Sequence, residues 1–504
     1  MKNVLEYLEN SVLKFPNKKA AADEFGSCTY EQLSEGSRRV GTYLTQALAP
    51  RSPVPVFMDK GINALKTFFG AAYAGCFYVL INPQLPSARI EHILKTLNAK
   101  IIVTEESGVE KFRELGLQSD IEILTFENME KTDVDDMALQ KIRDDFIDID
   151  PLYANFTSGS TGVPKGVLIS HRSVIDFIDN FTEIFDFSSD DIIGNQAPFD
   201  FDVSVKDIYS SLKMGATLEI IPKSLFSSPA QLLDYICEKE VSVMTWAVSA
   251  LCLISAFHGL DYKVPTSVKK ILFSGETMPL KHLQNWMNAL PDAQFVNLYG
   301  PTEITCNCTY YKVRRDEDYQ NGLPIGKAFP NERVFLLDDE NNLITKENAT
   351  GEICVAGTAL GLGYYNNREQ TDKAFVKNPL TPYYNEMIYK TGDLAYYGEN
   401  GNLYFSGRKD FQIKYMGHRI ELEEIEKSLS AVENVERACC LFLKEKNKLC
   451  AFFVGETTGK EIRQCLSKAL PVYMIPTSYV KLEEMPITKN GKIDRAKLAQ
   501  MKTR

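Results

Sequence analysis

The stretch TSGSTGVPKG, residues 157–166, decides the fold because an apolar run lies on each side of it. It holds three glycines, four hydroxyl side chains and one lysine, which together can surround a polyphosphate, since glycine lets backbone N–H groups approach closely. The apolar residues 152–156 and 167–169 predict a strand before and after the loop. Pro164 stands where a Walker loop has its second glycine, so we expect a different kind of phosphate loop. The alternative is a flexible Gly/Ser linker.

Length and composition indicate a globular protein of more than one domain. The chain has 504 residues, of which 44% are hydrophobic and 24% charged, and its net charge of −11 argues against a general nucleic-acid surface. The start, MKNVLEYLEN, carries acids where a signal peptide has a cationic segment, so we expect a cytoplasmic protein with no membrane insertion. The eleven cysteines are dispersed and lack zinc-site spacing, which favours a role in the core.

The first 150 residues alternate between helix and strand, which predicts a parallel sheet covered by helices. Thr29 and Gln32 form a capping box for a helix that runs to Leu48, and Ser87 is expected to cap a helix that runs to Leu97. Residues 106–147 are acidic and less periodic, and we expect them at the periphery. The expected strands are residues 54–57, 77–81 and 100–104.

The same alternation returns after the phosphate loop. Polar motifs follow two of the strands, Ser274-Gly275-Glu276 and Tyr299-Gly300-Pro301-Thr302-Glu303, and binding residues gather where parallel strands end. Residues 333–357 change to short strands and turns, which predicts a small β subdomain. The expected strands are residues 218–221, 241–247, 270–273 and 295–298.

The end of the chain has a pattern of its own. It predicts a helix at 421–429, strands at 437–443 and 449–454, and a helix at 461–470. Asn490-Gly491 predicts a tight turn that projects Lys492 outward. We therefore expect an α/β protein with an N-terminal domain, residues 1–408, of helix-covered β-sheets with a small β subdomain. A small, mobile α+β domain, residues 409–504, follows it.

Five motifs occur in the order typical of adenylate-forming enzymes, the superfamily of acyl-CoA synthetases, luciferases and amino-acid adenylation domains. They are TSGSTGVPKG, NLYGPTE, YKTGD, GRKDFQIKYMGHRIELEEIE and NGKIDR. The chain resembles this family over nearly its whole length. Within the family it is most similar to stand-alone D-alanine:D-alanyl-carrier-protein ligases, judged by its length and by the stretch NQAPFDFDVSVKDIY at 195–209. The resemblance implies that ATP and a carboxylate form an acyl-adenylate, from which a phosphopantetheine thiol displaces AMP.

The resemblance also assigns a nucleotide site. Glu303 is expected to bind Mg²⁺, which prefers oxygen ligands. Lys492 is the expected catalytic residue, because a lysine at the α-phosphate stabilises the charge that accumulates there by roughly 2.7–4 kcal/mol. The ATP- and AMP-binding residues would be Thr157, Ser158, Thr161, Lys165, Asn297, Tyr299, Thr302, Asp393, Arg408 and Lys492.

Asp202 aligns with the carboxylate that binds the substrate's α-ammonium group in amino-acid adenylation domains, which favours an amino-acid substrate. D-alanine ligases have an apolar residue in place of Lys206 and a cysteine in place of Ser274. Lys206 either faces an acidic substrate or extends towards solvent. The other expected pocket residues are Val203, Thr245, Leu272, Leu298, Cys306 and Asn307.

The chain contains no Gly-Gly pair and hence no GGxS-type phosphopantetheine attachment motif, so we expect a separate carrier protein as partner. By resemblance, Gly417 would line the pantetheine tunnel and Asp410 would be the hinge of a domain rotation between the two steps. Two alternatives are an acyl- or aryl-CoA ligase, against which Asp202 argues, and an inactive nucleotide-binding regulator.

Overall fold

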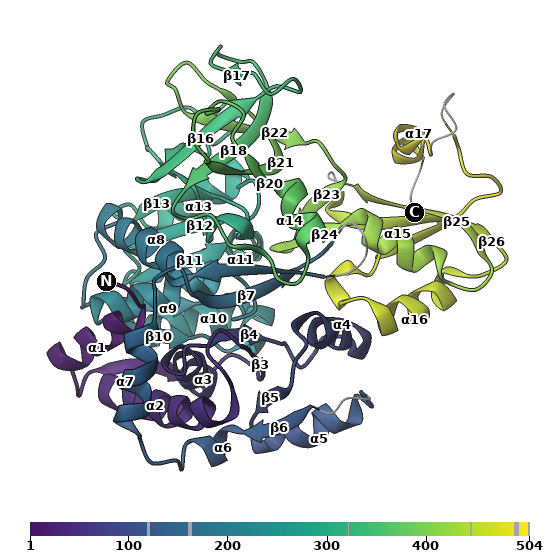
Figure 1. Ribbon diagram of the computed structural model, residues 1–504. Helices are drawn as coiled ribbons and strands as arrows, with labels where there is room; N and C mark the ends of the chain where they lie inside the picture. Colours follow the sequence, from purple (N-terminus) through teal and green to yellow (C-terminus); the bar gives the residue numbers. More distant parts are fainter. Residues whose placement is uncertain (118–120, 160–163, 321, 444–445, 488–492, 502–504) are drawn as a thin grey trace.

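A computed structural model of the chain describes residues 1–117, 121–159, 164–320, 322–443, 446–487 and 493–501. The described residues form two large sheets with helices packed around them, a smaller β subdomain, and a domain at the C-terminal end that lies to one side (Figure 1). This arrangement confirms the expected α/β fold. No helix of the described part combines the length and the apolarity that a membrane crossing requires.

The first large sheet contains the strands on both sides of the phosphate loop. Strands β7 and β8 pair antiparallel, with Thr157 opposite Lys165, so the loop joins two paired strands as predicted. The neighbouring β4, β3, β5 and β6 are parallel to one another. In spatial order, the described strands are β19 (Gly363–Tyr364), β8 (Lys165–Ser170), β7 (Pro151–Thr157), β4 (Phe77–Leu80), β3 (Pro53–Phe57), β5 (Ile101–Thr104) and β6 (Glu122–Thr125).

The second large sheet has a parallel centre with antiparallel strands at its edges. Ser274 ends β12 and Tyr299 ends the neighbouring parallel strand β13, so the two polar motifs lie at one edge, as expected. In spatial order, the described strands are β15 (Lys327–Ala328), β14 (Thr309–Lys312), β13 (Gln294–Tyr299), β12 (Lys270–Ser274), β11 (Val243–Ala247), β9 (Ile192–Asn195), β10 (Thr217–Ile220), β1 (Lys19–Asp23) and β2 (Gly26–Thr29).

The β subdomain is an antiparallel sheet, as the short strands predict. Asp393 lies on its long strand β21 and stands directly opposite Arg408 on β22. The described strands are β16 (Glu332–Leu337), β17 (Leu343–Ile344), β18 (Gly351–Gly357), β20 (Phe375–Lys377), β21 (Met387–Tyr397) and β22 (Leu403–Arg408).

Two helix starts test the capping predictions. Thr29 and Gln32 form the expected capping box at the start of α2. The prediction for Ser87 is wrong, because Pro86 is the N-cap of α4 and the structure has no side-chain cap bond there. Residues 106–147 contribute α5–α7 and the edge strand β6.

The described helices that precede the C-terminal domain are α1 (Leu5–Lys14), α2 (Tyr30–Ala47), α3 (Ile62–Tyr73), α4 (Ser87–Leu97), α5 (Glu106–Glu114), α6 (Phe126–Met129), α7 (Asp136–Asp145), α8 (His171–Ile184), α9 (Val203–Met214), η1 (Lys223–Ser227), α10 (Pro229–Glu238), α11 (Val248–Ala256), α12 (Gly259–Tyr262), α13 (Leu280–Ala289), η2 (Thr302–Ile304) and α14 (Arg368–Ala374).

The C-terminal domain has its own apolar core, which includes Ile420, Ile425, Leu449 and Met474. The exact boundary at 408/409 stays a prediction, and Lys492 lies outside the described residues. The domain begins with a hairpin, β23 (Gln412–Tyr415) and β24 (His418–Glu421). Its other described elements are α15 (Leu422–Ser430), β25 (Val435–Leu443), β26 (Lys448–Gly455), α16 (Gly459–Ala469), η4 (Val472–Met474), β27 (Ser478–Lys481) and α17 (Arg495–Gln500).

A buried ion pair joins the two domains. The guanidinium Nη1 of Arg89 on α4 lies 2.7 Å from Oε1 of Glu424 on α15, and their side chains are only 6% and 4% exposed. The other carboxylate oxygen of Glu424 is buried and finds no partner among the described residues. Arg89 is therefore the contact that compensates this buried charge.

We expect Arg89→Met to release the C-terminal domain rather than to unfold the chain. An uncompensated buried charge costs about 3–5 kcal/mol, and Glu424 can avoid this cost by moving into water with its domain. Amide hydrogen exchange should then rise in the hairpin 412–421, while the melting temperature of the N-terminal domain changes little. Arg172→Met, which removes a more exposed ion pair with Asp148, is the matched control. Equal exchange in both variants would contradict the prediction.

Candidate active site

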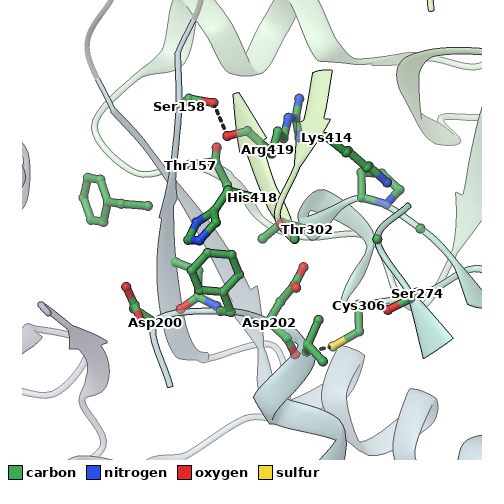
Figure 2. A pocket seen from close by; sticks show the side chains of 18 of the residues that line it. Thr157, Ser158, Asp200, Asp202, Ser274, Thr302, Cys306, Lys414, His418 and Arg419 are labelled. Carbon is green, nitrogen blue, oxygen red and sulfur yellow. Dashed lines mark hydrogen bonds between the residues drawn. The ribbon is translucent and has the colours of Figure 1, made fainter. Parts of the chain in front are cut away.

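One cavity lies where the edges of the two large sheets meet the C-terminal hairpin. Residues from β7, the start of α9, the ends of β12 and β13, and the hairpin line it together. Figure 2 shows Asp202, Thr302 and Cys306 on one side, with Lys414, His418 and Arg419 of the hairpin above them. The cavity therefore collects residues from four of the five motifs, and NGKIDR is the exception among the described residues.

Glu303, the expected magnesium ligand, is a fully buried carboxylate that does not line the cavity but contacts Arg419, which does. Nη1 of Arg419 lies 2.9 and 2.8 Å from its two oxygens, and the hydroxyl of Tyr364 donates to it at 2.8 Å. Burial alone would raise the pKa of Glu303, but Arg419 and Lys165 lower it to about 2. Glu303 is thus ionised in this arrangement. The sequence analysis missed Arg419 and Tyr364 as its partners.

The phosphate loop brings donors to the same place. Burial and the nearby Arg419 lower the pKa of Lys165, whose Nζ lies 4.8 Å from the centre of the Tyr364 ring. The Ser158 hydroxyl donates to the backbone oxygen of Arg419 at 2.9 Å. The hydroxyl of Thr157 is buried and lacks a partner among the described residues. Thr157 stands opposite Lys165 on the paired strand, and an unpaired buried hydroxyl there fits an anionic ligand such as a polyphosphate. Thr161 lies outside the described residues.

Asp393 holds a second polar cluster. The Tyr299 hydroxyl donates to it at 2.6 Å, and Arg408 contacts its other oxygen. Arg408 also donates twice to Asp410, at 2.6 and 2.8 Å. Asn297 donates its side-chain amide to the backbone oxygen of Pro324 at 2.8 Å. The structure thus brings Asp393, Tyr299 and Arg408 together, and their roles toward ribose and adenine stay predictions.

Asp202 occupies the N-cap position of α9 without capping it. Its backbone is helical, and the side chain makes no cap hydrogen bond. Burial raises the pKa of Asp202, and a hydrogen bond with Thr302 and the positive charge of Lys206 partly offset this effect. A carboxylate that is free of the helix end and faces a cavity is suited to bind a cation.

The expected side-chain pocket divides into two layers. Among the described residues, Val203, Ser274, Cys306 and Asn307 line the cavity with Asp202. Behind them lie Lys206, Thr245, Leu272 and Leu298, which are buried but do not reach the cavity surface.

Lys206 does not extend towards solvent. Its side chain is 1% exposed, and its ammonium donates to Oδ1 of Asn307 at 2.8 Å. This finding corrects one of the two alternatives stated for Lys206.

The hairpin closes the cavity from the C-terminal side. The Gly417 N–H donates to the Glu276 carboxylate at 2.6 Å, and its φ of 79° favours glycine. The Nζ atom of Lys414 lies 5.6 Å from the centre of the Tyr299 ring. Burial lowers the pKa of His418 to about 4, and its ring stacks on Tyr473 at 3.5 Å. The sequence analysis did not single out Lys414, His418 or Tyr473.

Residues that follow Lys492 lie elsewhere on the C-terminal domain. Arg495 donates to Glu426 of α15 at 2.8 Å and to the backbone oxygen of Cys440 on β25 at 3.0 Å. Ile493 packs with Met485 and Leu498 in an apolar cluster of the same domain. In this arrangement the hairpin, rather than the segment after Lys492, fills the cavity.

Comparison with curated proteins identifies relatives over the whole chain. It is 32% identical to zwittermicin A synthase ZmaJ from Bacillus cereus, over 98% of this chain and 94% of that protein. It is also 32% identical to the D-alanine--D-alanyl carrier protein ligase of Bacillus cereus (strain Q1), over 98% of each. Against bacitracin synthase 1 of Bacillus licheniformis the identity is 32%, and the chain spans only 9% of that protein.

Solved structures share the fold. The Vibrio cholerae adenylation domain AlmE, in complex with glycyl-adenosine-5'-phosphate, superposes with a TM-score of 0.86 at 20% identity, covering 99% of this chain and 98% of that one. PA1221, which contains adenylation and PCP domains, superposes with a TM-score of 0.85 at 24% identity. The superposition covers 99% of this chain and 84% of PA1221. The family model described as AMP-binding enzyme matches residues 8–365. With this match across most of its length, the chain belongs to the family of AMP-binding enzymes.

Proposed function

We propose that this enzyme uses ATP to activate an amino acid as its aminoacyl-adenylate and transfers the aminoacyl group to the phosphopantetheine thiol of a separate carrier protein. This proposal rests mainly on Asp202. Its carboxylate does not cap α9 but faces the cavity, which residues of the phosphate loop also line. An α-ammonium group is the cation that it would bind. The D-alanyl carrier protein ligase among the relatives supports the same chemistry.

The donors around the cavity suit a nucleotide triphosphate. Thr157, Ser158 and Lys165 would hold the phosphates, and Asp393 with Tyr299 would receive the nucleoside. Glu303 would hold Mg²⁺, which commonly binds one or two carboxylates together with phosphates. When bound, the ion would offset phosphate charge. In the present arrangement Arg419 supplies the cation for Glu303, so the hairpin and the metal would compete for this carboxylate.

The domain orientation fits the transfer step better than adenylation. Gly417 lies against Glu276 at the cavity, whereas the residues after Lys492 pack on α15 and β25. Adenylation would require Lys492 at the α-phosphate, and the hairpin would have to leave the cavity. Asp410, which follows β22 and precedes β23, is positioned to act as the hinge.

Two other functions fit less well. The substrate of an acyl- or aryl-CoA ligase has no ammonium group, so Asp202 would face the cavity without a cationic ligand. The chain retains Lys165, Glu303 and Asp393 in buried or partly buried positions, which argues against a silent nucleotide-binding regulator. Failure of every amino acid to support exchange of pyrophosphate into ATP would favour this second alternative.

We expect Asp202→Asn to lower the specificity constant for the amino acid by about 30-fold or more, because loss of one partner of a buried charge pair costs roughly 2–5 kcal/mol. ATP–pyrophosphate exchange measures this change. Asp200→Asn is the matched control, because Asp200 is a second buried carboxylate that lines the cavity two residues away. If the specificity constant fell by similar factors in both variants, the result would contradict a specific role for Asp202.

The pH profile gives an independent test of Asp202. Burial raises its pKa, so the free enzyme loses this negative charge as the pH falls, at a higher pH than an ordinary aspartate would. The specificity constant for the amino acid should therefore decline on the acid side. Asp202→Asn should abolish that decline, and an identical acid limb in the variant would contradict the assignment.

Arg419→Gln and Lys492→Ala should affect opposite half-reactions. Without Arg419 the hairpin loses its ion pair with Glu303, so loading of a pantetheine thiol from preformed adenylate should slow more than pyrophosphate exchange. Lys492→Ala should slow exchange more than loading, since one donor at the developing charge is worth roughly 2.7–4 kcal/mol. Single-turnover loading and pyrophosphate exchange, measured on both variants, show which half-reaction each residue serves. Equal loss of both steps in each variant would argue against the division.

A further inference from the structure

Asn307 lies in the part of the cavity wall that would face the side chain of a substrate. One buried lysine determines whether Asn307 donates or accepts hydrogen bonds there. The Lys206 ammonium donates to Oδ1 of Asn307 at 2.8 Å. An ammonium group has three donors and no acceptor, so only the carbonyl oxygen of Asn307 can face it. The NH₂ group of Asn307 must then point away from Lys206, and Asn307 is one of the residues that line the cavity. No described residue accepts a hydrogen bond from this NH₂ group.

The protein itself places negative charge near Lys206. Asp207 follows it on α9, is fully buried, and accepts hydrogen bonds from Thr245 and from Asn195, the latter at 2.9 Å. Burial lowers the pKa of Lys206, and the nearby Cys306, Asp202 and Asp207 partly offset this effect. Lys206 also lies behind Asn307 and out of reach of a ligand in the cavity. An acidic substrate side chain is therefore not needed to compensate it.

The remaining wall of the pocket adds one more donor. The Ser274 hydroxyl lines the cavity and has no hydrogen-bond partner among the described residues. The Cys306 thiol instead donates to the backbone oxygen of Asp202 at 3.0 Å, so it is engaged within the protein. Val203 contributes an apolar surface. The side-chain end of the pocket thus offers the Asn307 amide and the Ser274 hydroxyl to a ligand.

We propose that the enzyme selects an amino acid whose short side chain ends in a neutral oxygen acceptor, of which serine is the simplest. This inference rests on the proposed amino-acid activation. An alanine or another apolar side chain would leave the Asn307 donors buried without an acceptor. Pockets built to bind a hydroxyl reject analogues that lack it far more strongly than apolar pockets reject a missing methylene group.

Serine and 2-aminobutyrate form a matched pair of probes, because they differ only in a terminal hydroxyl or methyl group. In ATP–pyrophosphate exchange with both enantiomers of each, we expect a specificity constant at least about 10-fold higher for serine. Alanine and aspartate should also be poorer substrates. Equal or better activity with 2-aminobutyrate, alanine or aspartate would overturn the inference and leave amino-acid activation intact. No exchange with any amino acid would overturn both.

Variants test whether Lys206 acts through Asn307. Lys206→Met should let the amide turn its oxygen toward the cavity, so the preference for serine over 2-aminobutyrate should fall while the KM for ATP stays the same. Asn307→Leu, which keeps the size of the side chain, should reduce the preference to about one or reverse it. A purely structural role would lower activity with both substrates equally and would contradict the proposal. Lys213→Met is the control, since Lys213 lies on the same helix and pairs with Asp179.

Discussion

The ion pair between Arg419 and Glu303 is the interaction on which the closed cavity depends. Glu303 is fully buried, and an unpaired carboxylate in such a place is strongly disfavoured. Arg419 belongs to the hairpin of the C-terminal domain, so the charge of Glu303 holds that hairpin in the cavity. Departure of the hairpin takes Arg419 away from Glu303, so it is favoured when another cation replaces Arg419. A magnesium-bound nucleotide would meet this condition, so nucleotide binding and domain orientation would be coupled reciprocally.

Local patterns predicted much of the fold. The polar motifs after Ser274 and Tyr299 could be placed side by side because parallel neighbouring strands end at the same edge of a sheet. The phosphate loop could be placed between two strands because its apolar flanks are short and clear. In each case, residues close in sequence contain the information, and the family resemblance adds their order along the chain.

Contacts between distant residues could not be predicted in the same way. Arg419 and Glu303 are 116 residues apart, and Lys206 and Asn307 are 101 apart, so neither pair has a local pattern. Lys206 was expected either to face an acidic substrate or to reach solvent, because nothing near it in sequence reveals that Asn307 receives its hydrogen bond. Ser87 failed as a helix cap for a more local reason, since the helix begins at Ser87 itself, after Pro86.

A second cluster of polar side chains lies beside Lys206 and includes Asp207, the next residue of α9. Lys60 donates to Oδ1 of Asn195 at 3.1 Å, and Asn195 donates to Asp207 at 2.9 Å. The Lys60 ammonium donates to the oxygen of Asn195, so the NH₂ group of Asn195 is left to face Asp207. Buried charges of this kind add little stability but can hold one orientation. In the same way, the side of the Asn307 amide that faces the cavity is set by Lys206, which does not line the cavity.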